Sequence, residues 1–255
     1  MLLAVDCGNT HLVIGLFDGE KLLRSWRLST DTRKTEDEYL VMLRQLLAED
    51  GHSLQEISGM AVGSVVPAVN FALYKLADKY LRCEHCFVTY ETDTGIPILM
   101  DNPAEVGPDR IINAVSAHAK YSGPLIIVDF GTATTFDCIT AAGEYIGGAI
   151  CPGIEISQQA LFARAAKLAN IELRRPQSAV GKNTADCLRS GLLWGYGGQI
   201  DGLVRRMKAE IGSDATVIAT GGLASFISSF AETIDVVDGQ LTLEGLRMIW
   251  ERVHR

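Results

Sequence analysis

The stretch Leu125-Ile126-Ile127-Val128-Asp129-Phe130-Gly131-Thr132-Ala133-Thr134-Thr135 is the most informative part of the chain, because it repeats an arrangement found at the N-terminus. There, the apolar run Leu2 to Val5 ends in Asp6-Cys7-Gly8-Asn9-Thr10. Both stretches are typical of a buried strand that ends in an aspartate and enters a turn of glycine and hydroxyl-bearing residues. The second copy predicts that the chain begins a second, similar half near residue 125.

The segments that follow the two turns occur in the same order in both halves. A strand-like segment and a glycine turn come next, Asp18-Gly19 in the first half and Ala142-Gly143 in the second. A later apolar strand then meets a turn of small residues, Val62-Gly63-Ser64 or Ala219-Thr220-Gly221-Gly222. A shared order of this kind indicates an internal duplication. We predict an α/β protein of two related domains, 1–118 and 119–255.

Local patterns predict several elements within these halves. Thr35 and Glu38 have the spacing of a capping box at the start of the first helix. A buried strand is expected from Gly59 to Val66, and a long helix from about Thr184. Because each glycine weakens a helix by about 1 kcal/mol relative to alanine, the glycines of the long helix indicate close approach of another backbone, from this chain or from a second copy. They are Gly191, Gly195, Gly197, Gly198 and Gly202.

The composition narrows the possible classes of protein. The chain has 255 residues, of which 47% are hydrophobic and 21% charged, as in an ordinary globular protein. A net charge of −8 without a compensating run of Lys or Arg argues against a nucleic-acid or membrane partner. No apolar stretch approaches the roughly 20 residues of a membrane span, so we expect a cytoplasmic protein. The six scattered cysteines are expected to be free thiols.

The two aspartate-containing turns have the parts of a phosphate site. In the first turn, Asp6 can hold a metal ion or a water, Gly8 allows close backbone approach, and Asn9 and Thr10 supply donors. The alternative is an ordinary turn in which Asn and Gly are selected for a positive φ angle. The turn after Asp129 carries three hydroxyls within four residues, Thr132, Thr134 and Thr135, and this second copy favours phosphate binding.

Two further pairs of residues allow both a structural and a functional interpretation. Asp109-Arg110 precedes a helical pattern, where an aspartate can cap the helix N-terminus. In the functional interpretation, Asp109 is a general base and Arg110 binds an anion, since an arginine gains nothing from the positive end of a helix dipole. Gly221-Gly222 either forms a plain strand-to-helix turn or packs against the flat face of a nucleotide base.

Together these motifs resemble those of the type III pantothenate kinases, a family of the acetate kinase, sugar kinase, Hsp70 and actin superfamily. The resemblance extends over nearly the whole chain and depends on motifs in a fixed order. They are Asp6 to Thr10, Ser64 to Pro67, Asn102-Pro103, Glu105 to Gly107, Asp109-Arg110, Asp129 to Thr135, Gly147 to Ile150, Pro152-Gly153, Gly181-Lys182, Thr184 and Thr220 to Gly222.

The resemblance implies a fold and an activity. The fold is a pair of ribonuclease H-like domains around a nucleotide cleft. The activity is phosphorylation of pantothenate by ATP, the first step of coenzyme A synthesis. Mg²⁺ would accompany ATP, a monovalent cation, K⁺ or NH₄⁺, would also bind, and the chain would form a homodimer.

The resemblance also implies roles for individual residues. Asp109 matches the general base, and Asp129 matches the ligand of the monovalent cation. The implied ATP contacts are Asp6, Cys7, Gly8, Asn9, Thr10, His11, Leu12, Val13, Thr132, Gly221 and Gly222. The implied pantothenate contacts are Met100, Gly107, Pro108, Asp109, Arg110 and Thr184. Two positions depart from the family pattern, since Met100 stands where related chains often have tyrosine and Val13 where some have lysine.

Two alternative functions fit the same fold. One is another small-molecule kinase or a phosphatase of the superfamily, and the other is a nucleotide-dependent transcription accessory factor. The Asp109-Arg110 pair favours an enzyme, because a pure regulator has no need of a base.

Overall fold

The computed structural model describes residues 1–164 and 171–255, which form two compact units. The first unit combines Met1–Ser116 with Leu241–Arg255, and the second is Ala117–Gln240. The internal boundary is thus close to residue 118, but the C-terminal segment packs with the first unit. As a statement about evolutionary domains, the division into 1–118 and 119–255 stays a prediction.

The first unit is built on a five-stranded sheet with the strand order β3-β2-β1-β4-β5. Its strands are β1 (Leu2–Cys7), β2 (His11–Asp18), β3 (Lys21–Ser29), β4 (Gly59–Ser64) and β5 (Glu84–Phe87). β1 pairs antiparallel with β2 and parallel with β4. The turn after β1 and the loop after β4 therefore leave the sheet at the same edge.

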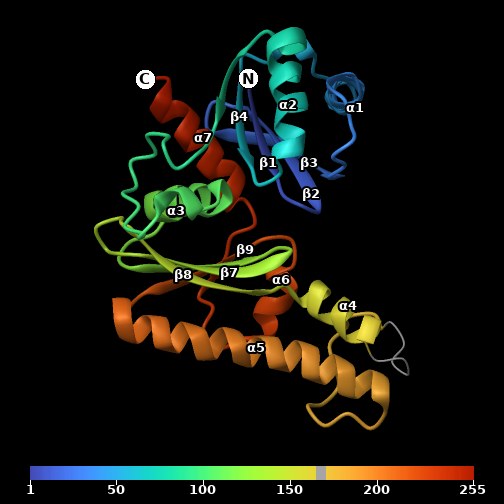
Figure 1. Ribbon diagram of the computed structural model, residues 1–255, viewed down its shortest axis with the longest axis vertical. Coiled ribbons are helices and arrows are strands. Elements are labelled where there is room, and N and C mark those ends of the chain that lie inside the picture. The colour runs from blue at the N-terminus through green and yellow to red at the C-terminus, as the bar shows by residue number, and fades with distance from the viewer. Residues whose placement is uncertain (165–170) are drawn as a thin grey trace. The chain divides into compact units, whose positions relative to one another are not determined.

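Helices cover both faces of this sheet (Figure 1). They are α1 (Glu36–Glu49), α2 (Pro67–Lys75), α3 (Pro108–Lys120) and α7 (Leu241–Val253), with short turns η1 (Leu54–Glu56), η2 (Leu76–Leu81) and η3 (Pro103–Glu105). Leu3 and Val5 of β1 belong to the cluster formed with α1 and α2. Leu2 and Ala4, which alternate with them, belong to the cluster formed with α3 and α7. The period-two alternation of a strand thus supplies two cores.

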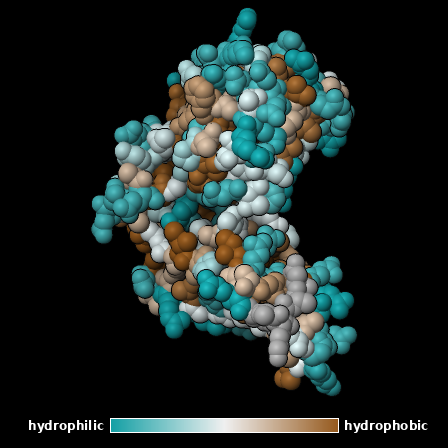
Figure 2. All heavy atoms as spheres, turned by 45° about the vertical axis from the view of Figure 1, so that its right-hand side comes forward, coloured by the Kyte–Doolittle hydropathy of each residue, from teal (hydrophilic) through white to brown (hydrophobic). Residues whose placement is uncertain are grey.

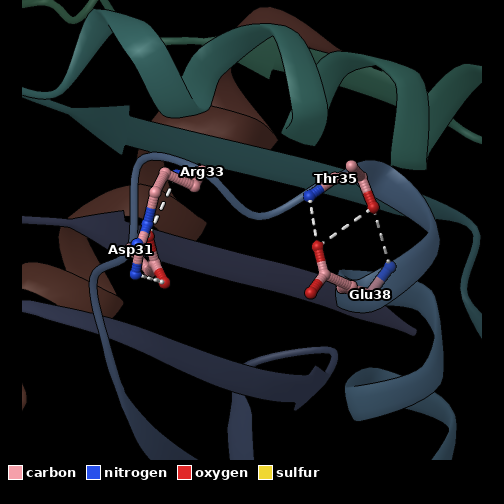
Figure 3. Close-up of polar contacts among 4 residues, drawn as sticks. All are labelled: Asp31, Arg33, Thr35 and Glu38. Carbon is pink, nitrogen blue, oxygen red and sulfur yellow. Dashed lines mark hydrogen bonds and ion pairs between the residues drawn. The ribbon is translucent and has the colours of Figure 1, made fainter.

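The capping box predicted for α1 is confirmed. The Thr35 backbone N–H donates to Glu38 Oε2 at 2.8 Å, and the Glu38 N–H donates to Thr35 Oγ1 at 3.4 Å (Figure 3). These bonds satisfy N–H groups that the first helical turn leaves without partners. In the segment before the cap, Arg33 hydrogen-bonds Asp31 and lowers the pKa of that carboxyl to about 2.

The second unit repeats the topology of the first. Its strands are β6 (Leu125–Phe130), β7 (Ala133–Ile139), β8 (Tyr145–Pro152), β9 (Thr216–Thr220) and β10 (Val236–Val237), in the order β10-β9-β6-β7-β8. β6 pairs antiparallel with β7 and parallel with β9, as β1 does with β2 and β4. The register also repeats, with Asp6 opposite Gly63 and Asp129 opposite Thr220. The predicted internal duplication is confirmed in the fold.

One face of the second sheet packs on helices. They are α4 (Ile154–Arg164), α5 (Thr184–Ile211) and α6 (Ala224–Ile227), followed by η4 (Ser228–Phe230). α5 confirms the predicted long helix. A Cβ on Gly197 would overlap the Phe230 carbonyl oxygen, so this glycine permits close packing within the chain. Around Gly191, Gly195 and Gly198, no described atom outside the helix's own neighbouring backbone lies within 4 Å of such a Cβ.

Among the described residues, no helix is both long enough and apolar enough to cross a membrane. On the face drawn in Figure 2, the apolar residues lie in separate groups among polar ones. The six cysteines are free thiols, as predicted.

Candidate functional site

β1 leads directly into the first candidate phosphate turn. The Gly8 N–H donates to the His11 carbonyl at 2.9 Å, and Thr30 Oγ1 donates to the Gly8 carbonyl at 2.6 Å. Neither Gly8 nor Asn9 has a positive φ angle, so selection for a left-handed turn does not explain them. Asn9, Thr10 and His11 are exposed, which makes their polar groups accessible to a ligand.

The flanking residues of this turn belong to the sheet. Cys7 lies opposite Leu12 in the β1/β2 pair, and both side chains are buried. Burial raises the pKa of the Cys7 thiol, which keeps it neutral. Asp6 and Val13 are also opposite each other and are half-buried. The side chains of Cys7 and Leu12 are therefore not available to a ligand that binds at the turn. These two residues can contribute only backbone groups.

The loop after β4 lies beside the first turn. The Val65 N–H donates to the Cys7 carbonyl at 3.1 Å, and the Val66 N–H donates to Ser64 Oγ at 3.1 Å. α2 then begins at Pro67, where a missing N–H has no cost. The Ser64 to Pro67 motif is thus a connection that fixes this loop against β1.

α3 brings the Asp109 carboxylate to the same loop. Asp109 lies in the first turn of α3, and its Oδ1 accepts the N–H of Arg110 at 2.9 Å. A Cβ on Gly107 would lie 2.6 Å from Asp109 Oδ1 and 3.7 Å from Val65 Cγ1. Gly107 therefore leaves the space that the Asp109 carboxylate occupies next to the loop after β4.

The environment of Asp109 changes its acidity. Desolvation raises the pKa of Asp109, and the N–H and positive charge of Arg110 offset part of this effect. A carboxylate with a raised pKa is a better proton acceptor than an exposed one, because its conjugate acid holds the proton more strongly. The hydrogen bond to the helix N–H supports the capping role of Asp109, and the raised pKa supports the role of base.

A short capped turn leads the chain into this region. Asn102 Oδ1 accepts the Ala104 N–H at 3.3 Å, and Asn102 Nδ2 donates to Glu105 Oε1 at 2.9 Å. Val106, which follows, is buried. The Asn102 to Glu105 motif therefore has a local structural role, which is to fix the path of the chain before Gly107. Met100 is half-buried just before this turn.

In the second unit, Asp129 has the position in β6 that Asp6 has in β1. A Cβ on Gly221 would overlap Asp129 Oδ1 and lie 2.7 Å from the Phe130 nitrogen, and the φ of Gly221 is +92°. Gly221 therefore has a structural role in the turn that follows β9. Gly222 is exposed beside it. A Cβ on Gly131, by contrast, would lie no closer than 3.6 Å to a described atom, so packing alone does not explain that glycine.

The three hydroxyls of the second turn do not share one face. Thr132 is exposed, and Thr135 is half-buried directly opposite Asp129. Thr134 is only 1% exposed and lies opposite Phe130, on the face that packs on the helices. The expectation that all three hydroxyls surround phosphate oxygens is therefore wrong for Thr134, because neighbouring residues of a strand point to opposite faces.

Residues later in the chain hydrogen-bond to the second turn and pack against it. The Gly153 N–H donates to the Thr132 carbonyl at 3.1 Å, and a Cβ on Gly153 would overlap that oxygen. Tyr196 of α5 donates to the Pro152 carbonyl at 2.7 Å and is 2.7 Å from Ser157 Oγ. Sequence analysis missed Tyr196, and its helical spacing alone does not distinguish it from any other core residue.

Thr184 is the first residue of α5 and is exposed. The preceding Asn183 caps the helix, because its Oδ1 accepts the Asp186 N–H at 2.9 Å. The Asn183 amide in turn donates to Asp186 Oδ2 at 2.7 Å. The cap satisfies the helix terminus and leaves the Thr184 side chain accessible.

Each unit thus assembles part of the predicted site at one sheet edge. The first unit gathers the β1 turn, the loop after β4 and the start of α3. The second gathers Asp129, the β6 turn and Gly221. Thr184 comes from the separate N-terminus of α5.

The fold and these turns define the class of protein as an α/β protein with two units of ribonuclease H-like topology. A solved structure described as a conserved putative Baf family transcriptional activator from Campylobacter jejuni matches with a TM-score of 0.59 and 18% identity, covering 99% of this chain and 98% of that chain. The ROK hexokinase from Thermus thermophilus matches with a TM-score of 0.55 and 13% identity, covering 99% of each chain. At these identities the likeness shows the fold alone.

Sequence comparison is more specific. The profile of the family described as type III pantothenate kinase matches residues 2–206. A type III pantothenate kinase of Myxococcus xanthus is 49% identical over 254 residues, which cover 100% of this chain and 99% of that protein. The chain belongs to the type III pantothenate kinase family.

We predict that Gly221→Ala lowers the free energy of unfolding by about 1 to 2 kcal/mol or more, because alanine is strained at a positive φ and its Cβ would displace Asp129. Urea unfolding measures this loss. Gly239→Ala is the matched control, since no described atom lies within 4 Å of a Cβ there. Equal losses in the two variants would contradict the packing of Gly221 on Asp129.

Proposed function

We propose that this chain transfers the terminal phosphoryl group of ATP to the primary hydroxyl of pantothenate, the first step of coenzyme A synthesis. The observation that carries the proposal is the 49% identity to a type III pantothenate kinase over the full length of both chains. The half-buried Asp109 beside Arg110 supplies the group that such a reaction needs at its acceptor.

The two turns are suited to binding the phosphates of ATP. Phosphoryl transfer depends on positioning and on neutralising negative charge more than on covalent help from the protein. We assign the exposed Asn9 and Thr10, the backbone of residues 6–13, and Thr132 to the ATP phosphates. The room at Gly131 supports close approach of a ligand there, and we assign Gly221 and Gly222 to the nucleotide as well.

At the acceptor, we assign the proton transfer to Asp109. Its carboxylate accepts the hydroxyl proton of pantothenate while the alcohol oxygen forms a bond to phosphorus and the bond to the ADP oxygen breaks. Arg110 is our candidate for binding the pantothenate carboxylate, because its guanidinium can form two parallel hydrogen bonds. Met100, Gly107, Pro108 and Thr184 complete the proposed acceptor contacts.

The family implies ATP with a divalent metal ion, and we assign a monovalent cation, K⁺ or NH₄⁺, to Asp129. In the part of the chain that the structure describes, no three His, Cys, Asp or Glu side chains converge on one point. The donors available at Asp129 are a single carboxylate with hydroxyl and backbone oxygens, and such oxygens suit a cation that needs no soft ligand. When bound, this cation would supply positive charge that offsets the negative charge of the phosphates.

We also propose a cytoplasmic homodimer that forms through α5. Gly191, Gly195, Gly198 and Gly202 share one face of α5 by their spacing. Trp194, on the same face, is 38% exposed. A face of glycines next to one large ring is suited to close packing against a second copy. The free cysteines suit a reducing compartment.

We predict that Asp109→Asn lowers turnover by about 10²- to 10⁴-fold while ATP still binds, because the amide cannot accept the proton. Pantothenate-dependent ADP release and ATP titration measure the two effects. Asp101→Asn, at an exposed carboxylate earlier in the same segment of the chain, is the control with wild-type turnover.

The pH profile adds a second check of Asp109. Since desolvation raises its pKa, the base is lost as pH falls through a value above the ordinary 3.8, and kcat/KM should fall there. Wild-type turnover in Asp109→Asn would contradict the assignment of the base. ADP release that does not depend on pantothenate would instead contradict the kinase proposal and favour a nucleotide-dependent regulator.

We predict that Asp129→Asn abolishes activation by K⁺ and NH₄⁺, because it removes the negative charge that attracts the cation. Initial rates in potassium, ammonium and choline chloride at equal ionic strength measure this response. Asp214→Asn, at an exposed aspartate of the same unit, should keep it. An unchanged cation response in Asp129→Asn would show that another residue binds the cation.

We predict that Gly195→Glu yields a monomer, because a charged side chain would stand where a second α5 packs. Sedimentation equilibrium measures the mass in solution. Gly239→Glu, at a glycine with similar space around it, should leave the dimer intact. A dimeric Gly195→Glu variant would exclude this face of α5 from the interface.

A further inference from the structure

The second sheet contains a buried carboxylate that the proposed chemistry does not use. Asp137 of β7 is 0% exposed, and the Tyr145 hydroxyl, also 0% exposed, donates to its Oδ1 at 2.6 Å. A buried carboxylate is costly even when hydrogen-bonded, and apolar residues of similar size often stabilise a core more. A contribution of Asp137 to the binding site would explain why a carboxylate is buried at this position.

The register of the sheet places Asp137 near the proposed cation. In the β6/β7 pair, Asp129 lies opposite Thr135, and Ile127 lies opposite Asp137. Opposite residues project to the same face of a sheet, as do residues two apart on one strand. Asp129, Thr135 and Asp137 therefore share one face, with Thr135 between the two aspartates.

Thr135 and Asp137 are linked by a long hydrogen bond in which the threonine hydroxyl is the donor. Thr135 Oγ1 donates to Asp137 Oδ2 at 3.5 Å. A hydroxyl has one proton and two lone pairs, so this proton is then unavailable to a phosphate oxygen. The remaining lone pairs of Oγ1 can bind a positive ion.

We propose that Thr135 is a second oxygen ligand of the monovalent cation at Asp129, and that Asp137 is a positioning residue that orients the Thr135 hydroxyl. The inference rests on the proposed assignment of the cation to Asp129 and extends that site by two residues. Partners that orient a metal ligand typically change metal affinity by about 10- to 100-fold when they are removed.

The chain offers a closely matched control for this proposal. Thr134 is the neighbour of Thr135 on the same strand, but it points to the opposite face and is buried among the helices. Thr134→Val and Thr135→Val therefore make the same chemical change one residue apart. Thr135→Ser keeps the hydroxyl and should restore what Thr135→Val loses.

The test measures the potassium concentration that gives half-maximal pantothenate phosphorylation. We expect Thr135→Val and Asp137→Asn to raise it by about tenfold or more, with little change in kcat at saturating potassium. In Asp137→Asn, the amide can donate to Thr135 Oγ1 and occupy the lone pair that the cation needs. Thr134→Val and Thr135→Ser should resemble the wild type.

A second readout does not depend on turnover. With ATP present and pantothenate absent, replacing choline chloride by potassium chloride should raise the melting temperature of the wild type, since a ligand stabilises the state that binds it. Thr135→Val should lose most of this gain, and Thr134→Val should keep it. A full potassium-dependent gain in Thr135→Val would overturn the inference, even if Asp137→Asn fails to fold.

The two readouts separate this inference from the proposed function. If the wild type phosphorylates pantothenate and Thr135→Val keeps the wild-type potassium response, the kinase assignment stands and the role of Thr135 is overturned. If the wild type does not phosphorylate pantothenate, the melting temperatures still decide whether Thr135 takes part in cation binding. A wild type with no potassium-dependent gain would overturn both the cation assignment and this inference.

Discussion

The close contact between the Asp129 carboxylate and the backbone of Gly221 is the constraint on which the second half of the site depends. Parallel pairing of β6 with β9 places Asp129 opposite Thr220, so Gly221, the residue that follows β9, lies directly against the carboxylate. Only a residue without a Cβ fits there, and its positive φ turns the chain away from the strand. A carboxylate is thereby held at the strand end, beside a turn that Gly153 supports from behind.

The duplicated topology accommodates two different kinds of chemistry. In the first unit, the turn after β1 exposes Asn9, Thr10 and His11, which suits a ligand rich in acceptor oxygens. In the second unit, Asp129 lies opposite Thr135, which suits a positive ion. The proposed base, Asp109, belongs to neither turn, because it enters from α3 and is accommodated by Gly107. The shared topology therefore fixes the positions of the side chains. The residue type at each position determines which ligand the side chain can bind.

Local patterns in the sequence were sufficient for most elements and for the duplicated order. The capping box at Thr35 and the long helix α5 depend on residues that are close in sequence, and both were predicted. The contacts that were missed depend on distant residues. α7 packs with the first unit, and Tyr196 reaches Pro152 across 44 positions in the sequence. Strand register determines the face of the sheet to which Thr134 points, and composition and turn residues do not reveal that register.

The central claim is that ATP and pantothenate react directly on this chain, and the identity of the product tests it most directly. Phosphorus NMR of a mixture of enzyme, ATP, Mg²⁺, K⁺ and pantothenate follows every phosphate species at once. The account predicts that a phosphomonoester signal of 4′-phosphopantothenate grows in step with ADP, while inorganic phosphate does not accumulate. ADP that appears together with inorganic phosphate, or no change in ATP when pantothenate is added, would contradict it.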